Sequence, residues 1–250
     1  MKINYLLVVF MVLTFKLYAQ KNITGDNING VYKFEGKLGN RIPISMWFMM
    51  KDSVLKGELV YLNTAHRQPI TILGTIENTG DITIDEFTKT GDITGEFKAM
   101  FKGNSLAGEW LNPVTKKMFN YILKRKDTTI TAANKNLEPE EINGEYEYNF
   151  GENGGAGGID IKHISGGNYL IGVNCVTPYP PANVAEVEKT VVSMSGNTII
   201  YTDSDCSSKF RIRVFKDFVV INDIIYGNCF GVGAYVAGIF IKTQTKPSFD

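Results

Sequence analysis

Few residues of this chain have the types and spacing that chemistry at a site requires. Asp203-Ser204-Asp205 places two carboxylates two positions apart, and calcium is a cation that takes several such oxygen ligands. The glycine and the terminal glutamate of an EF-hand loop are missing, so a polar turn is the better interpretation. Three dispersed cysteines and two histidines are also too few for a metal cluster. We therefore expect neither a metal nor another cofactor.

General acid–base catalysis has few candidate groups. The two histidines, His66 and His163, have no neighbouring serine, cysteine or acid in an arrangement typical of a catalytic triad. A carboxylate would have to serve instead, for example Asp85 or Glu86 within residues 83–87 (TIDEF). Charges on the surface of a strand are the commoner explanation of such a run. The sequence therefore favours a protein that is not an enzyme.

Two loop segments stand out by composition. Residues 151–158 (GENGGAGG) resemble a phosphate-binding loop, but such a loop needs the N-terminus of a helix behind it. Residues 159–162 (IDIK) alternate as a strand does, so we predict the tip of a hairpin. The second segment, residues 177–183 (TPYPPAN), carries Tyr179. Loops on a rigid β scaffold are where binding residues gather.

Aromatic side chains are the most suggestive binding residues. Residues 42–50 (IPISMWFMM) are apolar on both faces of a predicted strand, with Trp47 opposite the core positions. Either the outer face contacts something, such as a second domain, or the strand is inverted and Trp47 lines a cavity. Trp110 could close the floor of a barrel. Core or inter-domain packing is the alternative for both tryptophans. Together with Tyr179, they are the candidate ligand-binding residues.

The elements that must position these residues follow from a repeat. Residues 28–34 (INGVYKF) return as residues 142–148 (INGEYEY). The closing segments match more loosely and pair residues 108–110 and 121–124 with residues 233–235 and 240–242. Each unit has about a hundred residues of short alternating segments, the size of one small barrel or sandwich. Closure into a barrel hides the edges of such a sheet best.

We therefore predict an all-β chain with two consecutive antiparallel up-and-down β-barrel-like domains. The first spans residues 28–126, a polar linker spans residues 127–141, and the second spans residues 142–243. In the clearest strand, residues 42–50, the even-numbered positions are expected to face the core. A short helix capped near Asn136 is the alternative interpretation of part of the linker.

Residues 1–19 have the features of a signal peptide. Lys2 precedes an almost wholly apolar run, residues 3–15. Leu17-Tyr18-Ala19 then offers a small residue before Gln20, where a signal peptidase could cut. The apolar run is short for a membrane span, and an uncleaved anchor is the alternative. We therefore expect a mature chain that is free in the periplasm or outside the cell, with no membrane anchor.

Composition and charge limit the partners. Hydrophobic residues make up 44% and charged residues 21% of the chain, which are ordinary values for a globular protein. The formal net charge is zero, because 26 basic residues balance 26 acidic ones. A nucleic-acid-binding protein usually has a broad basic surface, so we expect no nucleic-acid partner.

The three cysteines fit an oxidising compartment, which favours one bridge and one remaining thiol. Cys206 and Cys229 each precede a strand-like segment late in the second domain. If those strands are neighbours, the two cysteines come within disulfide reach, so we favour this pair. Cys175–Cys206 and Cys175–Cys229 remain open alternatives. Under the favoured pairing, Cys175 is a free, mostly buried thiol.

Two resemblances rest on these residues. Gly30-Val31-Tyr32, the polar-tipped hairpins and Gly108-Glu109-Trp110 resemble the small lipocalin-like or avidin-like barrels of exported bacterial proteins. Asp205-Cys206, residues 209–214 and residues 229–238 (CFGVGAYVAG) resemble a class of uncharacterised secreted bacterial β domains with a paired-cysteine Cys-Phe-Gly-x-Gly pattern. The first resemblance implies a barrel that holds a small apolar ligand. Some exported β modules of this general kind inhibit lysozymes.

These observations predict an exported, non-enzymatic binding protein whose partner is a small apolar molecule or an extracellular protein. Two alternatives stay open: a lysozyme-inhibitor-like protein, or a hydrolase or isomerase with a carboxylate-based site in one barrel. A cavity lined by aromatic side chains would favour the binding protein. A buried carboxyl group with a strongly raised pKa in a cleft would favour the enzyme.

Overall fold

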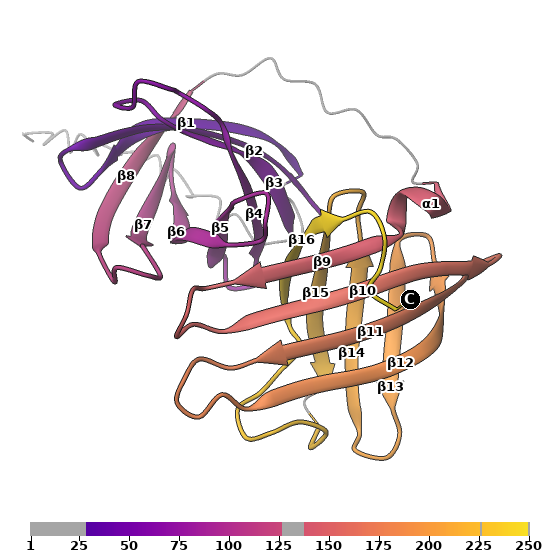
Figure 1. Ribbon diagram of the computed structural model, residues 1–250. Coiled ribbons are helices and arrows are strands. Elements are labelled where there is room, and N and C mark those ends of the chain that lie inside the picture. Colours follow the sequence, from indigo (N-terminus) through magenta and orange to yellow (C-terminus); the bar gives the residue numbers. More distant parts are fainter. Residues whose placement is uncertain (1–28, 127–137, 226, 250) are drawn as a thin grey trace, which may run out of the picture.

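A computed structural model describes residues 29–126, 138–225 and 227–249 of the protein (Figure 1). Within these residues the strands form two closed antiparallel barrels that follow one another along the chain. The predicted fold class is therefore confirmed. The predicted signal peptide and most of the predicted linker lie outside the described residues.

Barrel one is a simple meander in which each strand pairs with the next and the last strand returns to the first. Tight turns make this possible; in the turn between the sixth and seventh strands, Gly103 adopts a left-handed φ of 58°. The eight strands are β1 (Gly30–Leu38), β2 (Ile42–Lys51), β3 (Val54–Tyr61), β4 (Ile70–Ile76), β5 (Ile82–Phe87), β6 (Ile93–Lys102), β7 (Ser105–Leu111) and β8 (Met118–Lys126).

The interior of barrel one is filled by side chains. In β2 the even-numbered residues from Ile44 to Met50 are at most 1% exposed, whereas Trp47 on the other face is half-buried. The predicted orientation of this strand is therefore confirmed. Aromatic rings dominate the core, which includes Tyr32, Phe34, Phe48, Phe97, Trp110 and Tyr121.

Barrel two repeats this meander. Its first strand pairs with both the second and the last, which closes the barrel. A short helix, α1 (Pro139–Ile142), precedes the first strand; Glu138 is its N-cap residue, and Pro139 lies in the first turn. The strands are β9 (Gly144–Asn149), β10 (Ala156–Ser165), β11 (Asn168–Val176), β12 (Val184–Ser195), β13 (Thr198–Asp203), β14 (Ser208–Val214), β15 (Phe218–Ile225) and β16 (Gly238–Gln244).

The two parts of the second closing segment differ in structure. Residues 240–242 lie in the last strand, but residues 233–235 do not, because β16 begins at Gly238. Gly233 adopts a left-handed φ of 72°, which is incompatible with an extended strand, and the residues before Gly238 form turns. The helix also differs from its prediction: it begins after Glu138, while Asn136 lies outside the described residues.

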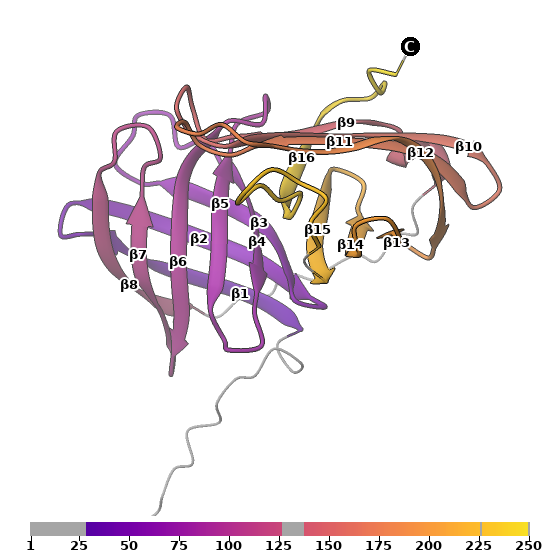
Figure 2. The ribbon, with the colours of Figure 1, turned by 90° about the horizontal axis from the view of Figure 1, so that it is seen from below.

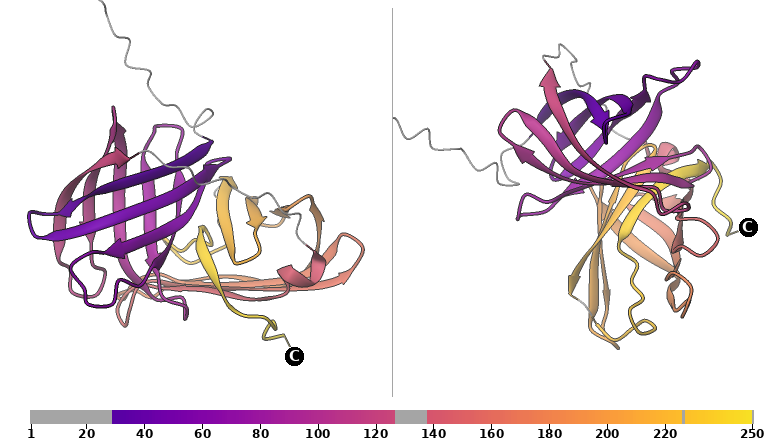
Figure 3. Two further views of the ribbon diagram at one scale, coloured as in Figure 1. Left: turned by 90° about the horizontal axis from the view of Figure 1, so that it is seen from above. Right: turned by 90° about the vertical axis from the view of Figure 1, so that its left-hand side faces the viewer.

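The two barrels share an apolar interface. In β15, Val219 and Ile221 pair with inward-facing residues of β14, so Phe218 and Val220 point out of barrel two. They join one apolar cluster with residues on the outside of barrel one, namely Val54, Leu73, Phe87 and Ile93. Figures 2 and 3 show β15 and β16 on the side of barrel two that lies next to β3, β4 and β5.

Polar contacts frame this interface. The backbone N–H of Asn149 donates to the carbonyl oxygen of Gly91 over 3.0 Å, joining β9 to the turn before β6. The Lys56 ammonium lies 2.6 Å from the Asp217 carboxylate. No helix in the described part of the chain has the length and apolar character needed to cross a bilayer.

Candidate functional site

A cleft of about 270 Å³ lies between the barrels. Barrel one contributes the ends of β6 and β7 and the turn that follows β7. Barrel two contributes the ends of β9 and β11 and three loops. The principal walls come from Leu111 and Pro113 of barrel one and from Tyr148, Phe150, Val176, Pro178 and Tyr235 of barrel two. We call this cavity the inter-barrel cleft.

The barrel-two wall is aromatic and rigidly held. The Tyr148 ring meets Phe150 and Phe240 edge to face, with ring centroids 5.8 Å and 4.9 Å away. Gly157 makes room for it, because a Cβ at this position would lie 2.5 Å from Tyr148 Cε1 and 2.8 Å from Cys175 Sγ. Burial raises the pKa of Tyr148, so its hydroxyl stays protonated near neutral pH. Tyr235 is 52% exposed and adds a second ring from the loop between β15 and β16.

The two loops singled out in the sequence meet at this cleft. Asn153 and Gly154 from the first loop and Pro178 from the second line the cavity. They are tied together, because the backbone N–H of Tyr179 donates to the carbonyl oxygen of Asn153 over 3.3 Å. Gly154 is required in the first loop, since a Cβ there would lie 2.5 Å from the Phe150 carbonyl oxygen.

The barrel-one wall is built on an Asx turn. The Asn112 side-chain oxygen accepts backbone hydrogen bonds from Val114 and Thr115 over 3.1 Å and 2.7 Å, which holds Pro113 in place. Gly151 of barrel two packs directly on Val114, whose Cγ2 is 3.0 Å from the position that a Cβ would occupy. Glu96 and Lys116 add one negative and one positive group to the cleft. The cavity is therefore apolar in its walls with charges at two places.

The three aromatic candidates from the sequence do not come together. Trp110 is in the core of barrel one, 7% exposed and stacked on Phe119. Trp47 lies on the outer face of β2 and donates its indole N–H to Glu58 over 3.1 Å. Tyr179 is 69% exposed beside the inter-barrel cleft but does not line it.

Glu86 is the centre of a polar cluster inside barrel one. Its carboxylate is 1% exposed and accepts hydrogen bonds from the Trp110 indole (2.7 Å), the Tyr61 hydroxyl (2.8 Å) and the Thr94 hydroxyl (3.3 Å). Burial raises the pKa of Glu86, and these three donors partly oppose the rise. Gly95 leaves room for the cluster, because a Cβ there would lie 2.4 Å from the Trp110 indole nitrogen.

Asp85 faces the other way, out of barrel one. It pairs in the sheet with Leu73 and Glu96 and is only 7% exposed. One carboxyl oxygen, Oδ1, has no hydrogen-bond partner. Burial, together with the charges of Glu96 and Glu86, raises the pKa of Asp85 to about 8, against a smaller opposing effect of Lys98. Neither Asp85 nor Glu86 lines the inter-barrel cleft.

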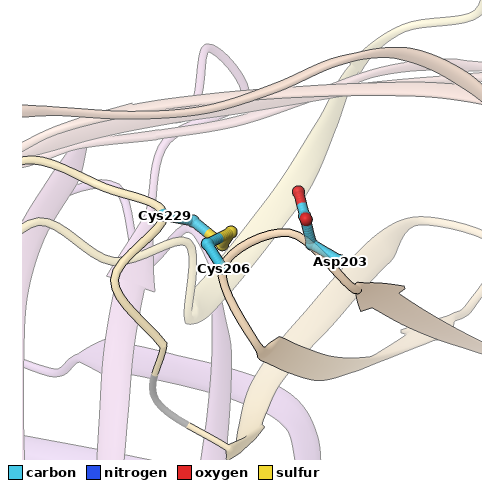
Figure 4. A group of neighbouring side chains, drawn as sticks. All are labelled: Asp203, Cys206 and Cys229. Atoms are coloured by element: carbon cyan, nitrogen blue, oxygen red, sulfur yellow. A yellow bond between two sulfur atoms is a disulfide. The ribbon is translucent and has the colours of Figure 1, made fainter.

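The favoured disulfide is present. Cys206 and Cys229 are bonded, with Cα atoms 5.1 Å apart, and Cys175 is free and buried. Burial raises the pKa of the Cys175 thiol to about 12, which makes it a poor nucleophile. Figure 4 shows Asp203 beside the bridge. Because both sulfurs are bonded to each other, they do not offer thiolates to a metal, and the Asp203 carboxylate accepts the backbone N–H of Asp205 over 2.9 Å.

Sequence reasoning identified the loops of the cleft but missed its aromatic residues. Tyr148 ends the second copy of the repeated segment and Phe150 follows it, where a core role was the natural expectation. Tyr235 lies in residues 229–238, which were noted for a resemblance and for the closing match of the repeat, and not for binding. An aromatic residue directly beside each glycine-rich segment was the signal available. No local pattern showed that these rings would face barrel one.

Comparisons with known proteins add no relative. No protein-family model, no curated protein and no solved structure matches the chain. The resemblance to lipocalin-like and avidin-like barrels therefore stays a prediction. Function has to be argued from the geometry of the molecule itself.

Proposed function

We propose that the protein is a non-enzymatic binding protein that holds a small, mainly apolar molecule with an aromatic ring in the inter-barrel cleft. The observation that carries this proposal is the cavity of about 270 Å³ walled by Tyr148, Phe150 and Tyr235. Small-molecule sites favour concave, largely apolar cavities at domain interfaces, with a few polar groups that orient the ligand. This cleft has each of those properties.

The chemistry of the walls supports a ring-bearing ligand. Edge-to-face and offset contacts with aromatic rings contribute about 0.5–1.5 kcal/mol each beyond the burial of apolar area. Glu96 and Lys116 offer a carboxylate and an ammonium to polar groups of the ligand. The volume fits a molecule of one or two rings. A long lipid chain would need a deeper cavity.

Binding of single- and double-ring aromatic compounds tests the proposal. Saturation-transfer NMR with indole and a set of similar fragments should detect binding to the unmodified protein. Tyr235→Ala should weaken it by about tenfold, because a flanking ring is lost. Leu111→Ala should also weaken it, because the opposite wall belongs to barrel one. Native mass spectrometry of protein purified from its own host should then identify the natural ligand.

Tyr179→Ala is the matched control. It removes an exposed tyrosine from a loop of the same cleft without changing the cavity wall. Fragment binding that survives both Tyr235→Ala and Leu111→Ala would place the ligand elsewhere and overturn the proposal. Loss of binding in Tyr179→Ala alone would have the same consequence.

An enzymatic role receives less support. Two buried carboxyl groups with raised pKa values exist, in Asp85 and Glu86. Glu86 is already hydrogen-bonded to three side chains, and Asp85 is only 7% exposed. A general acid or base must reach its substrate, and neither group lines the cleft. Lysozyme inhibition rests on the resemblance alone.

We also propose that the protein acts outside the cytoplasm. The Cys206–Cys229 disulfide supports this, because such bonds persist mainly in oxidising compartments. The apolar run in residues 3–15 supports export through a cleaved signal peptide, to the periplasm or the exterior. N-terminal sequencing of the exported protein should return a start near Gln20. An intact Met1 would contradict this.

A further inference from the structure

The outer face of barrel two is hollowed where β9 to β12 run side by side. A cavity of about 520 Å³ lies against this face, and we call it the outer groove. Gly158 and Gly172 face outward here, because their neighbours Ile159 and Ile171 are buried inside the barrel. A glycine has no side chain, so these positions let another chain approach the backbone of the sheet.

The outer groove is acidic. Five carboxylates and one ammonium line it, and they belong to Glu145, Glu147, Asp160, Glu186, Glu188 and Lys189. The four glutamates form no ion pair with any residue that the structure describes. Burial raises the pKa of Glu145, and the nearby carboxylates of Glu147 and Asp160 raise it further. A bound cation would therefore relieve repulsion within the groove.

A segment of the chain itself is seated at one end of the groove. After β16 the chain crosses to the side of the β9–β12 layer that faces away from β13 to β15 (Figures 2 and 3). The backbone N–H and the hydroxyl of Ser248 both donate to Asp160, each over 2.6 Å. The Phe249 ring lies against Gly172, where a Cβ would be 3.1 Å from its Cε1 atom.

Lys189 completes this binding position, which we call the seat and which consists of Asp160, Gly172 and Lys189. Its ammonium donates to the carbonyl oxygen of Phe249 over 3.3 Å and lies 5.1 Å from the centre of the Phe249 ring. The seat thus recognises features of an extended chain: a backbone N–H, a hydroxyl, a carbonyl oxygen and an aromatic ring. Ser248 and Phe249 line the cavity without filling it. The glutamates beside them still face open volume.

We propose that the outer groove is a docking site for an extended, basic segment of a partner protein. Residues 248–249 occupy the seat in its absence. Charge complementarity selects a segment rich in lysine or arginine for the part lined by glutamates. The Ser248–Phe249 contacts show that the adjoining seat accepts a serine and an aromatic residue. This inference is independent of ligand binding in the inter-barrel cleft.

A labelled peptide tests the proposal directly. The probe is a fluorescein-labelled, C-terminally amidated peptide, Lys-Lys-Lys-Pro-Ser-Phe, followed by fluorescence anisotropy at low salt. In the full chain, Ser248→Ala/Phe249→Ala empties the seat, so this variant should bind the probe about fivefold more tightly than the unmodified chain. Adding Glu147→Gln/Glu186→Gln should weaken binding by about tenfold. Added salt should weaken binding further.

Matched controls distinguish binding in the outer groove from non-specific attraction of the basic probe to acidic residues elsewhere on the protein. Glu109→Gln/Glu152→Gln removes two carboxylates outside the groove and should leave probe binding unchanged. A peptide with glutamates in place of the lysines should not bind. Equal binding of the acidic peptide, equal weakening by the control pair, or no binding to the seat-emptied variant would overturn the proposal. Sedimentation that shows a dimer lost in Ser248→Ala/Phe249→Ala would also overturn it, by making a second copy the occupant.

Discussion

Barrel one and barrel two begin with segments that agree at four of seven residues and they share one topology, yet they place their polar groups on opposite sides of the barrel wall. Barrel one encloses a carboxylate, Glu86, and surrounds it with donors. Barrel two encloses apolar side chains, and its carboxylates line a groove on the outside. The repeated segment therefore specifies the meander, whereas glycines and acidic residues elsewhere decide where a ligand can approach.

The barrels also differ in how continuously their neighbouring strands pair. In barrel one, β1 and β8 pair over six residue pairs, from Lys33–Lys126 to Leu38–Tyr121. In barrel two, β12 and β13 share only two pairs, Met194–Ile199 and Ser195–Thr198. The disulfide joins the turn between β13 and β14 to the loop between β15 and β16. Barrel two is therefore stabilised by a disulfide where the pairing of β12 with β13 is short. Barrel one is stabilised by continuous strand pairing and a buried polar cluster.

Glu86→Ala should have the largest effect on stability. It leaves the Trp110 and Tyr61 donors without their acceptor in a buried site and opens a cavity, at a cost of roughly 4 kcal/mol. Both tryptophans lie in barrel one, so urea unfolding followed by tryptophan fluorescence reports this barrel. Glu86→Gln keeps a hydrogen-bond acceptor and should lower the free energy of unfolding less. Substitution of an exposed residue, Glu109→Ala, should change it little. Equal stability of Glu86→Ala and Glu109→Ala would show that the polar cluster around Glu86 does not stabilise barrel one.

Cys206→Ser/Cys229→Ser should destabilise barrel two by about 3 kcal/mol, because the bond closes a loop of 23 residues. Circular dichroism follows both barrels, whereas tryptophan fluorescence follows barrel one. The transition seen by circular dichroism should move to lower urea more than the fluorescence transition. Identical shifts in the two signals would mean that the barrels unfold as one unit.

Asp85→Asn should stabilise the protein at pH 8 by about 2 kcal/mol. The pKa of Asp85 is raised from 3.8 to about 8 in the folded chain. Between these values the folded state holds a proton that the unfolded state releases, so stability falls as pH rises. Urea midpoints from pH 4 to pH 9 should show a flatter decline in Asp85→Asn than in the unmodified chain. An unchanged slope would show that Asp85 does not carry this pH dependence.

The smallest effect should come from the ion pair between the barrels. Lys56 and Asp217 keep 41% and 53% of their side-chain surface exposed, so their coupling should stay below about 1 kcal/mol. A double-mutant cycle with Lys56→Ala and Asp217→Ala measures it. The pair Lys33–Glu35 within β1, with both side chains 38% exposed, is the matched control. A coupling well above the control value would give the inter-barrel pair a specific role in docking.

Much of the fold followed from local patterns. Strand alternation, turn residues and the repeated segment predicted two meanders, and the positions of Cys206 and Cys229 predicted the bridge. None of these local patterns predicted how the two barrels pack against each other. Asp85 alternates as a surface residue should, yet it is 7% exposed and pairs with Leu73, which belongs to the apolar cluster between the barrels. Likewise, Trp110 and Tyr61 reach Glu86 from 24 and 25 residues away in sequence, so no short-range spacing could join them.

The apolar outer face of barrel one has a consequence for synthesis. Val54, Leu73, Phe87 and Ile93 are covered by residues of β15 and β16, and β16 is the last strand in chain order. Because a chain emerges from its N-terminus, barrel one can complete its own hydrogen bonds well before that cover exists. During that interval, folded barrel one exposes an apolar surface to which other protein chains can bind. The order of strands along the chain thus makes the late arrival of β16 the step at which nascent protein is most exposed to aggregation.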